Sequence, residues 1–352
     1  MKLFTVGPVS MDKETLAVRS EQIPYFRTNE FSELVLNTAK NLKDLMGTSQ
    51  DSKAIFITGS GSASMEAVVS NSFDETDNIL VINGGSFGSR FKKLCEIYNL
   101  QHDEIHLDFG EELSSEHFNK LDGKKYTALL VNIHETSTGQ LYDIDLISNF
   151  CKKNNIYLVV DAISSFLSDP YEMDNWNIDC TIISSQKAMA LAPGLSMVVM
   201  NNRFYENKVK DKPMKNLYLN LNEHIKNMER GQTPNTPAVG IILELNDKLK
   251  RIKEFGLENY INKAKENADF FRNEIKNLPI KTPNYKLSNT LTPLIFENNR
   301  AKVLYTYLRE KYDITVTPNG GELADKVLRV GHIGNISKSD LKDLIQKMKE
   351  VL

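Results

Sequence analysis

The sequence predicts an α/β protein with a mainly parallel sheet in a large domain and a smaller C-terminal α+β domain. Three observations support this fold class. Short apolar, β-rich runs alternate with helix-length segments over the first two thirds of the chain, which is typical of βαβ units. Turns rich in glycine and serine follow several of these runs. Beyond Pro237 the pattern changes to long helical segments and a few short strands.

The apolar runs and the segments between them predict the elements of the large domain in order. Strands are expected at 54–58, 78–83, 128–132, 156–161, 181–183 and 197–200. Helices are expected at 64–71, in a stretch through Cys95 and Ile97, and at 141–153. Since crossovers between parallel strands are right-handed, the turns after these strands should meet at the carboxyl edge of the sheet.

The C-terminal third has a different periodicity. A long helical pattern covers 239–278, with apolar residues at helical spacing. Short strands at 292–296, 314–316 and 327–330, and helices at 301–311 and 339–352, make the smaller unit. We therefore predict an arm at 1–15 that crosses the two parts, a large domain at 16–245 and a small domain at 246–352.

The composition restricts the class of partner and the compartment. The 352 residues carry a formal charge of −3, which provides no attraction for nucleic acid or an anionic membrane. No run reaches the roughly 18 apolar residues of a membrane span, and the first residues do not resemble a signal peptide. Cys95, Cys151 and Cys180 are widely spaced and do not form metal-ligand pairs, which predicts reduced thiols in a cytoplasmic protein and no metal site.

Lys187 and Asp161 are the most informative residues of the chain. Lys187 follows an expected strand and lies in a locally apolar stretch, and Asp161 ends another strand. A lysine that forms a Schiff base with pyridoxal phosphate needs an acid at the pyridinium nitrogen, which keeps the ring an electron sink. Desolvation would lower the lysine pKa and make the amine nucleophilic. The alternatives are a solvated lysine and a helix-capping carboxylate.

Two turns at the same edge fit a phosphorylated, planar cofactor. The turn 58–64, Thr-Gly-Ser-Gly-Ser-Ala-Ser, offers backbone N–H groups at a helix N-terminus, where a phosphate binds. It lacks the spacing of nucleotide-binding glycine motifs, which disfavours ATP and NAD. In the turn 83–90, glycines on both sides of Phe87 let its ring stack on a cofactor. Helix capping and a core aromatic residue are the structural alternatives.

Three further positions have a functional and a structural interpretation. Ser137 or Thr138, in the loop that opens with His134, can hydrogen-bond the ring oxygen of pyridoxal or cap a helix. Thr236, in a proline-fixed loop, suits a phosphate oxygen. Arg329 is a lone cation within a strand, where it binds either a substrate carboxylate or phosphonate, or an internal acid.

Together these residues resemble the class V aminotransferases of fold type I, over essentially the whole chain. The most similar group acts on alanine and glyoxylate, serine and pyruvate, or 2-aminoethylphosphonate and pyruvate. The motifs that carry the resemblance are Gly7-Pro8, Arg27 before Glu30-Phe31, Gly59-Ser60-Gly61 with Glu66-Ala67, Glu135-Thr136-Ser137-Thr138-Gly139, Asp161, Gln186-Lys187, Pro193-Gly194 and Arg329-Val330-Gly331.

The resemblance implies a role for each matching residue. Lys187 would be the Schiff-base lysine and Asp161 the pyridinium partner. Pyridoxal phosphate would also be held by Ser60, Gly61, Ser62, Phe87, Ser137, Ile163 and Gln186, with Thr236 reaching in from a second subunit of a homodimer. Arg329 or Arg27 would bind the acid group of the substrate. The family often has histidine where Ser62 stands, and the loop around Tyr25-Phe26-Arg27 departs from the alanine–glyoxylate pattern.

The predicted activity is ping-pong transamination between a small amino acid, alanine or glutamate, and a small carbonyl compound. A phosphonate or phosphate group on the carbonyl compound is compatible with this prediction. The His-Glu-Thr opening of the third loop resembles the phosphonate branch. The alternatives are a pyridoxal phosphate lyase or decarboxylase on the same fold, such as a cysteine desulfurase, and a non-catalytic binding protein. A desulfurase needs a mobile cysteine, typically late in the chain, whereas all three cysteines precede Lys187.

Overall fold

A seven-stranded sheet forms the centre of the large unit in this computed structural model, which describes residues 1–297 and 300–352. Its strand order is β2-β10-β9-β8-β5-β3-β4. The strands are β2 (Lys53–Thr58), β3 (Asn78–Asn83), β4 (Gln101–His106), β5 (Ala128–Asn132), β8 (Tyr157–Asp161), β9 (Cys180–Ser184) and β10 (Leu195–Met200). Only β10 runs antiparallel to its neighbours in this sheet. The predicted mainly parallel α/β fold is therefore confirmed.

The middle of this sheet is covered by helices, so its strands are apolar on both faces. Every residue of β5, β9 and β10 is buried. The covering helices include α2 (Asn29–Met46), α3 (Gly61–Ser72), α4 (Gly88–Ile97) and α6 (Ile144–Asn154), and α3 packs on β9 and β10. Because the strands are parallel, the turns that follow β2, β3, β5, β8 and β9 lie at one edge of the sheet.

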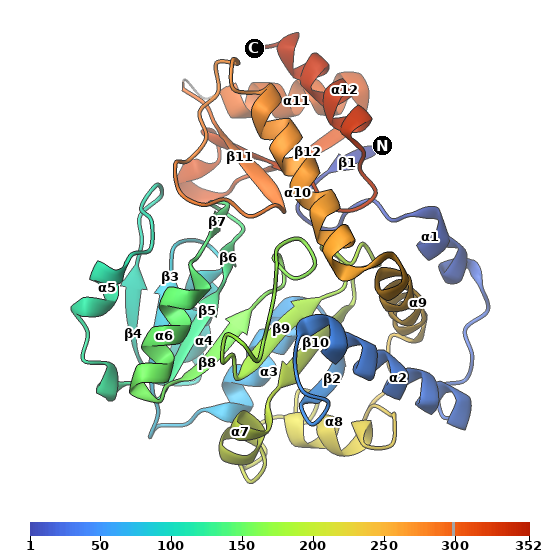
Figure 1. Cartoon of the computed structure of the whole chain (residues 1–352), viewed down its shortest axis with the longest axis vertical. Helices are drawn as coiled ribbons and strands as arrows, with labels where there is room; N and C mark the ends of the chain where they lie inside the picture. Colours follow the sequence, from blue (N-terminus) through green and yellow to red (C-terminus); the bar gives the residue numbers. More distant parts are fainter. Residues whose placement is uncertain (298–299) are drawn as a thin grey trace.

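The C-terminal unit has its own sheet and its own core. Figure 1 shows this unit, with both chain ends, above the seven-stranded sheet. Its four strands have the order β1-β12-β13-β11. They are β1 (Lys2–Phe4), β11 (Leu291–Ile295), β12 (Ile314–Pro318) and β13 (Val327–Gly331), and α10 (Leu257–Glu274), α11 (Arg300–Tyr312) and α12 (Lys338–Lys349) pack with them.

The N-terminal segment has contacts in both units, and the arm predicted at 1–15 stays a prediction. β1 pairs in parallel with β12 of the small sheet, whereas Val9 belongs to the core of the large unit. α1 (Lys13–Ser20) then packs on α9 (Val239–Phe255). The domain boundaries at residues 15 and 245 stay predictions; α9 packs in the core of the large unit, and α10 contributes Ala264 to that core and Phe271 to the small one.

Several elements differ from the sequence prediction. The helical pattern at 239–278 forms two helices, α9 and α10, because Gly256 has φ +92° and interrupts the helical path. The helix expected at 141–153 begins at Ile144, since Gln140–Leu141 (β7) pairs with His134–Glu135 (β6). β4 and α2 were not predicted; β4 is a largely exposed edge strand without an apolar run.

The remaining helices lie in the connections. They are α5 (Ser115–Asn119), α7 (Asn202–Phe204) and α8 (Leu221–Met228), the 3₁₀ turns Gly123–Lys125 and Gly321–Leu323, and the π-helix Tyr205–Val209. Within the described ranges, no helix is long and apolar enough to cross a membrane.

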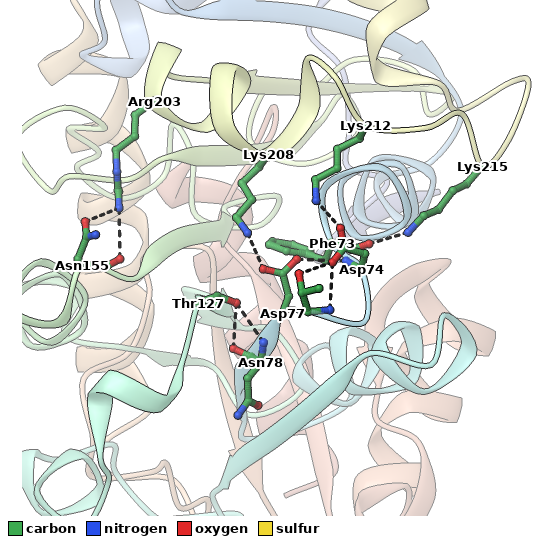
Figure 2. A network of polar contacts seen from close by, with 11 residues as sticks. Phe73, Asp74, Asp77, Asn78, Thr127, Asn155, Arg203, Lys208, Lys212 and Lys215 are labelled. Carbon is green, nitrogen blue, oxygen red and sulfur yellow. Dashed lines mark hydrogen bonds and ion pairs between the residues drawn. The ribbon is translucent and has the colours of Figure 1, made fainter.

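Ion pairs and a hydrogen bond from basic side chains link the segment after β10 to the turn that precedes β3. Figure 2 shows Lys208 directed at Asp77 and Lys212 at Asp74, while Lys215 donates to the carbonyl oxygen of Phe73. The Lys208–Asp77 pair joins Nζ and Oδ1 at 2.5 Å, and the side chains are 12% and 2% exposed. A pair this well buried ties the π-helix to the sheet, because either charge alone would be costly to desolvate.

Candidate active site

A cavity of about 120 Å³ lies at the carboxyl edge of the large sheet. Eight of the predicted residues line it: Ser60, Gly61, Ser62, Phe87, Asp161, Ile163, Gln186 and Lys187. They come from the turns after β2, β3, β8 and β9, which the parallel topology brings together. A larger hollow of about 340 Å³ lies elsewhere, against α2, β2 and α8, and contains none of the predicted residues.

Lys187 is held in the cavity as a readily deprotonated amine. It follows β9 in a tight turn, in which the N–H of Ala190 donates to the carbonyl oxygen of Lys187 at 2.8 Å. Its side chain is buried, and this burial lowers its pKa from 10.5 to about 8. The charge of Arg329 adds to that effect, and Asp161 opposes it. A buried amine that loses its proton near neutral pH suits Schiff-base formation.

Asp161 lacks a cationic partner among the described residues. Its Oδ1 accepts a hydrogen bond from the N–H of Ile163 at 2.8 Å, and no ion pair of the described chain includes it. Burial raises its pKa from 3.8 to about 7, against the lowering effects of that hydrogen bond and of Lys187. A protonated ring nitrogen would supply the missing charge. The donor set thus fits the pyridinium of pyridoxal phosphate.

The turn after β2 offers backbone donors at the N-terminus of α3. Ser60 is the N-cap residue, and its side chain makes no capping hydrogen bond. Gly61 lies so close to Ile163 that an added Cβ would be 2.3 Å from its Cδ1. Ser184 also lies close to Gly61, and its hydroxyl donates to the side-chain oxygen of Gln186. This arrangement leaves room and free N–H groups for a phosphate at the start of α3.

Glu135 builds the turn that presents Phe87. Its carboxylate accepts hydrogen bonds from the N–H of Gly88 at 3.0 Å and of Phe87 at 3.3 Å, and so satisfies the first turn of α4. The hydroxyl of Ser137 donates to the same carboxylate and accepts from the N–H of Ser86 at 3.1 Å. Ser137 is not among the residues that line the cavity, whereas Thr136 is. The role predicted for Ser137 stays a prediction.

Arg329 is a buried cation whose partners are neutral. Its Nη1 donates to the carbonyl oxygen of Thr136 at 3.0 Å, and its Nη2 donates to that of Pro318 at 2.8 Å. Its Nε is buried and has no partner in the described chain. Burial lowers the pKa of Arg329 from 12.5 to about 10, although the charge of Glu135 acts to raise it. An arginine in this state is suited to an acid group from a ligand.

Arg27 and Thr236 both lie outside this cavity. Arg27 donates from Nη1 to the side-chain oxygen of Gln232 at 2.9 Å and to the carbonyl oxygen of Thr233 at 3.0 Å. Thr236 is exposed in the same loop. Neither side chain lines the cavity of its own subunit. The predicted roles, a substrate contact for Arg27 and a contact from a second subunit for Thr236, therefore stay predictions.

Four residues without a predicted role also line the cavity: Arg90, His134, Thr136 and Ser164. His134 hydrogen-bonds through Nδ1 with the Ser164 hydroxyl at 2.9 Å, and its buried Nε2 has no partner in the described chain. Burial lowers its pKa from 6.5 to about 3, so the ring is neutral. The sequence did contain a sign that Arg90 belongs to the site. Arg90 follows Phe87 by three positions, and the other residues at 84–89 are glycine and serine.

Gly7 was recognised as a motif residue without a role. An added Cβ there would lie 2.6 Å from Cδ of Lys187. The arm therefore covers the lysine directly, and only glycine permits this approach.

The three cysteines are buried and free. None of them lines the cavity, and burial raises the pKa of each thiol. The described residues also contain no group of three or more His, Cys, Asp or Glu side chains that could hold a metal ion. A desulfurase needs a reactive cysteine at its active site, and none of the three cysteines lies at this cavity.

Comparison with known proteins gives matches over nearly the whole chain. The family model "Aminotransferase class-V" matches residues 16–336. An uncharacterised aminotransferase of Methanocaldococcus jannaschii is 29% identical over 94% of this chain and 87% of its own length. A protein of Anabaena cylindrica named soluble hydrogenase 42 kDa subunit is 27% identical over 100% of this chain and 93% of its own length.

A solved structure agrees with these matches. The alanine–glyoxylate aminotransferase of Nostoc sp. superposes with a TM-score of 0.92 at 25% identity, and the match covers 99% of this chain and 94% of the Nostoc chain.

Proposed function

Since this chain belongs to the aminotransferase class V family and is a pyridoxal phosphate-dependent transaminase, we propose that its amino donor is a small amino acid and its acceptor a small 2-oxo acid. Alanine and glutamate are the proposed donors. The observation that carries this proposal is Arg329, a buried guanidinium with only carbonyl partners in the described chain. The α-carboxylate of an amino acid supplies the negative charge that this site lacks.

The bound cofactor accepts the amino group and acts as an electron sink. The chain's own groups do the rest. Lys187 would hold the cofactor and then, as a free amine, would accept the proton from the substrate Cα and deliver it to C4′ of the cofactor. Its lowered pKa leaves a large neutral fraction for this step. Asp161 holds the ring nitrogen in its protonated form, and Phe87 covers one face of the ring. Arg329 fixes the carboxylate, which orients the Cα–H bond.

The proposed assembly is a homodimer in which Thr236 contacts the cofactor phosphate of the other subunit. Thr236 is exposed on its own subunit and lies outside its own cavity, which supports this proposal. Arg27 anchors the same loop through Gln232 and Thr233. We also place the protein in the cytoplasm, where free thiols such as these three persist.

A second substrate class is an amine that carries a phosphonate in place of the carboxylate. The sequence His134-Glu135-Thr136 favours it, because this opening resembles the phosphonate branch of the family. A phosphonate would occupy the same guanidinium of Arg329, since arginine binds both anions through paired N–H groups. Both classes therefore predict that Arg329 is required, and they differ only in the amine that reacts.

A half-reaction screen separates these substrates. Alanine, glutamate, serine, 2-aminoethylphosphonate and small amino phosphates are added singly to the purified holoenzyme, and the visible absorbance of the cofactor is followed. We expect alanine or glutamate to convert the cofactor to its aminated form. Arg329→Gln should raise the half-saturating concentration about 100-fold. If only 2-aminoethylphosphonate converts the cofactor, the proposed amino acid donor is wrong. If none of the amines converts it, transamination of these substrates is contradicted.

A further inference from the structure

Arg90 stands where the N-termini of α3 and α4 approach one another at the cavity. It lies in the first turn of α4, and its Nη1 donates to the hydroxyl of Ser62, in the first turn of α3, at 2.7 Å. Its Cζ lies 5.1 Å from the centroid of the Phe87 ring. None of the ion pairs in the described chain includes Arg90. A neutral hydroxyl and an aromatic face are therefore its partners.

This position is electrostatically unfavourable without an anion. A helix N-terminus carries a partial positive charge, so a cation in the first turn opposes the helix dipole. Here the first turns of two helices and a guanidinium meet, and α4 has no acidic residue in its first turn. Because Arg90 is exposed, solvent screens this repulsion in the free protein. The gathering of positive charge is typical of a site that binds a negative ligand.

The cations around the cavity already have tasks, with one exception. The amine of Lys187 must be neutral to react. Arg329 does not line the cavity, and the proposed function assigns it to the acid group of the substrate. Arg90 alone among the cavity's described cations lies beside the turn at the start of α3. A phosphate monoester near pH 7 carries up to two negative charges, and a helix terminus offsets only about half of one.

We propose that Arg90 is a binding residue for the phosphate of the cofactor, to which its guanidinium transfers the hydrogen bond now made to Ser62. This inference rests on the proposed function, because it places the phosphate at the start of α3. A phosphate at this position would give Arg90 the anionic partner that it lacks, and it would also lie next to Ser62. The guanidinium of Arg90 lies over the ring of Phe87 in a cation–π contact, which restricts the conformations of the Arg90 side chain before the ligand binds.

The test compares pyridoxal phosphate with pyridoxal, which lacks the phosphate. The apoproteins of wild type, Arg90→Gln, Arg90→Lys and the control Lys93→Gln are titrated with each ligand, and bound ligand is followed by its visible absorbance. Lys93 is exposed on the same helix and does not line the cavity. We expect Arg90→Gln to weaken pyridoxal phosphate about 10- to 100-fold and pyridoxal less than about threefold. Arg90→Lys should lose less affinity for pyridoxal phosphate than Arg90→Gln, because lysine keeps the positive charge although it lacks the paired N–H donors of the guanidinium.

A second readout is the phosphorus NMR signal of the bound cofactor. Arg90 should hold the phosphate as a dianion to lower pH, so in Arg90→Gln its protonation should occur at higher pH. Equal weakening of both ligands, or an equal loss in Lys93→Gln, would overturn the proposal. These titrations contain no amine. A holoenzyme that binds as expected and converts no amine would therefore contradict the proposed function and leave the role of Arg90 supported.

Discussion

Lys187 and Asp161, the proposed cofactor residues, show how burial shifts the pKa values of two groups in one cavity. Burial disfavours the charged form of each group, so the pKa of the amine falls to about 8 and that of the carboxyl rises to about 7. Both groups are therefore ready to exchange protons near neutral pH. The two residues also act on one another, since Asp161 raises the pKa of Lys187 whereas Arg329 lowers it.

The first prediction concerns cofactor attachment as a function of pH. Only the neutral amine of Lys187 reacts, and a pKa of about 8 means that its neutral fraction rises through that pH. The rate of attachment to apoprotein should therefore rise with a midpoint near pH 8. Arg329→Gln should move the midpoint up and Asp161→Asn should move it down, as followed by stopped-flow absorbance. Arg19→Gln, an exposed charge on α1, is the control. Midpoints that move in neither active-site variant would contradict the assignment.

At the scale of elements, the N-terminal arm acts as a cover for Lys187. The arm is held at one end by β1 in the small sheet and at the other by Asp12, the N-cap of α1, which pairs with the buried Lys248 of α9. Between these anchors Gly7 has φ +139° and lies against the lysine side chain. The cover is therefore positioned by both units.

The second prediction is that Gly7→Ala impairs cofactor binding without unfolding the protein. Its Cβ would lie 2.6 Å from Cδ of Lys187, and the backbone conformation is strained for alanine. The amount of cofactor bound at limiting concentration should fall as the dissociation constant rises about 10- to 100-fold. Gly320→Ala, where the added Cβ meets nothing within 4 Å, serves as the control. Wild-type binding by Gly7→Ala would show that the arm does not restrain the lysine.

The third prediction concerns the basic network of Figure 2. Lys208→Met removes the partner of Asp77, whose side chain is 2% exposed, and leaves a buried carboxylate unpaired. The free energy of unfolding should fall by about 3 kcal/mol in denaturant titrations. Lys210→Met is the matched control, because Lys210 pairs with Glu206 at the exposed surface and such pairs contribute little. Equal changes in the two variants would argue against a stabilising role for the buried pair.

At the scale of the whole molecule, the small unit helps to shape the cavity of the large one. Arg329 donates to Thr136, Asn319 donates to the carbonyl oxygen of Ser137 at 2.7 Å, and Tyr285 donates to that of Thr138 at 2.8 Å. All three contacts hold the loop after β5. Movement between the units would therefore change this loop and Arg329, the proposed substrate-binding residue, together.

The fourth prediction tests the shared active site by mixing variants. A Lys187→Ala subunit lacks the reactive amine, and a Thr236→Glu subunit would repel the phosphate of its partner's cofactor. In a mixed dimer, one site would have an intact Lys187 and an intact Thr236. At limiting cofactor, random mixing should restore about a quarter of wild-type activity, whereas each variant alone is nearly inactive. No recovery after verified subunit exchange would mean that Thr236 does not serve the other subunit.

Much of the large unit was predictable from local patterns. Apolar runs bounded by glycine-rich turns predicted β2, β3, β5, β8, β9 and β10 within a few residues. Asp161 was predictable because it ends such a run and Lys187 because it follows one closely, and both line one cavity. The break at Gly256 and the strand β4 were not predicted, since an amphipathic pattern continues past the glycine and β4 has no apolar run.

Local sequence determined most strands of the large unit and the chemistry available at the strand ends, because these depend on neighbours a few residues apart. Tertiary structure alone decided which of those ends meet. Arg329 and Thr136 are 193 positions apart in the chain, and Arg90 reaches Ser62 only because β2 and β3 feed two helices that start at one edge. Burial also depends on the assembled fold, and burial is what moves the pKa values of Lys187 and Asp161 towards neutrality.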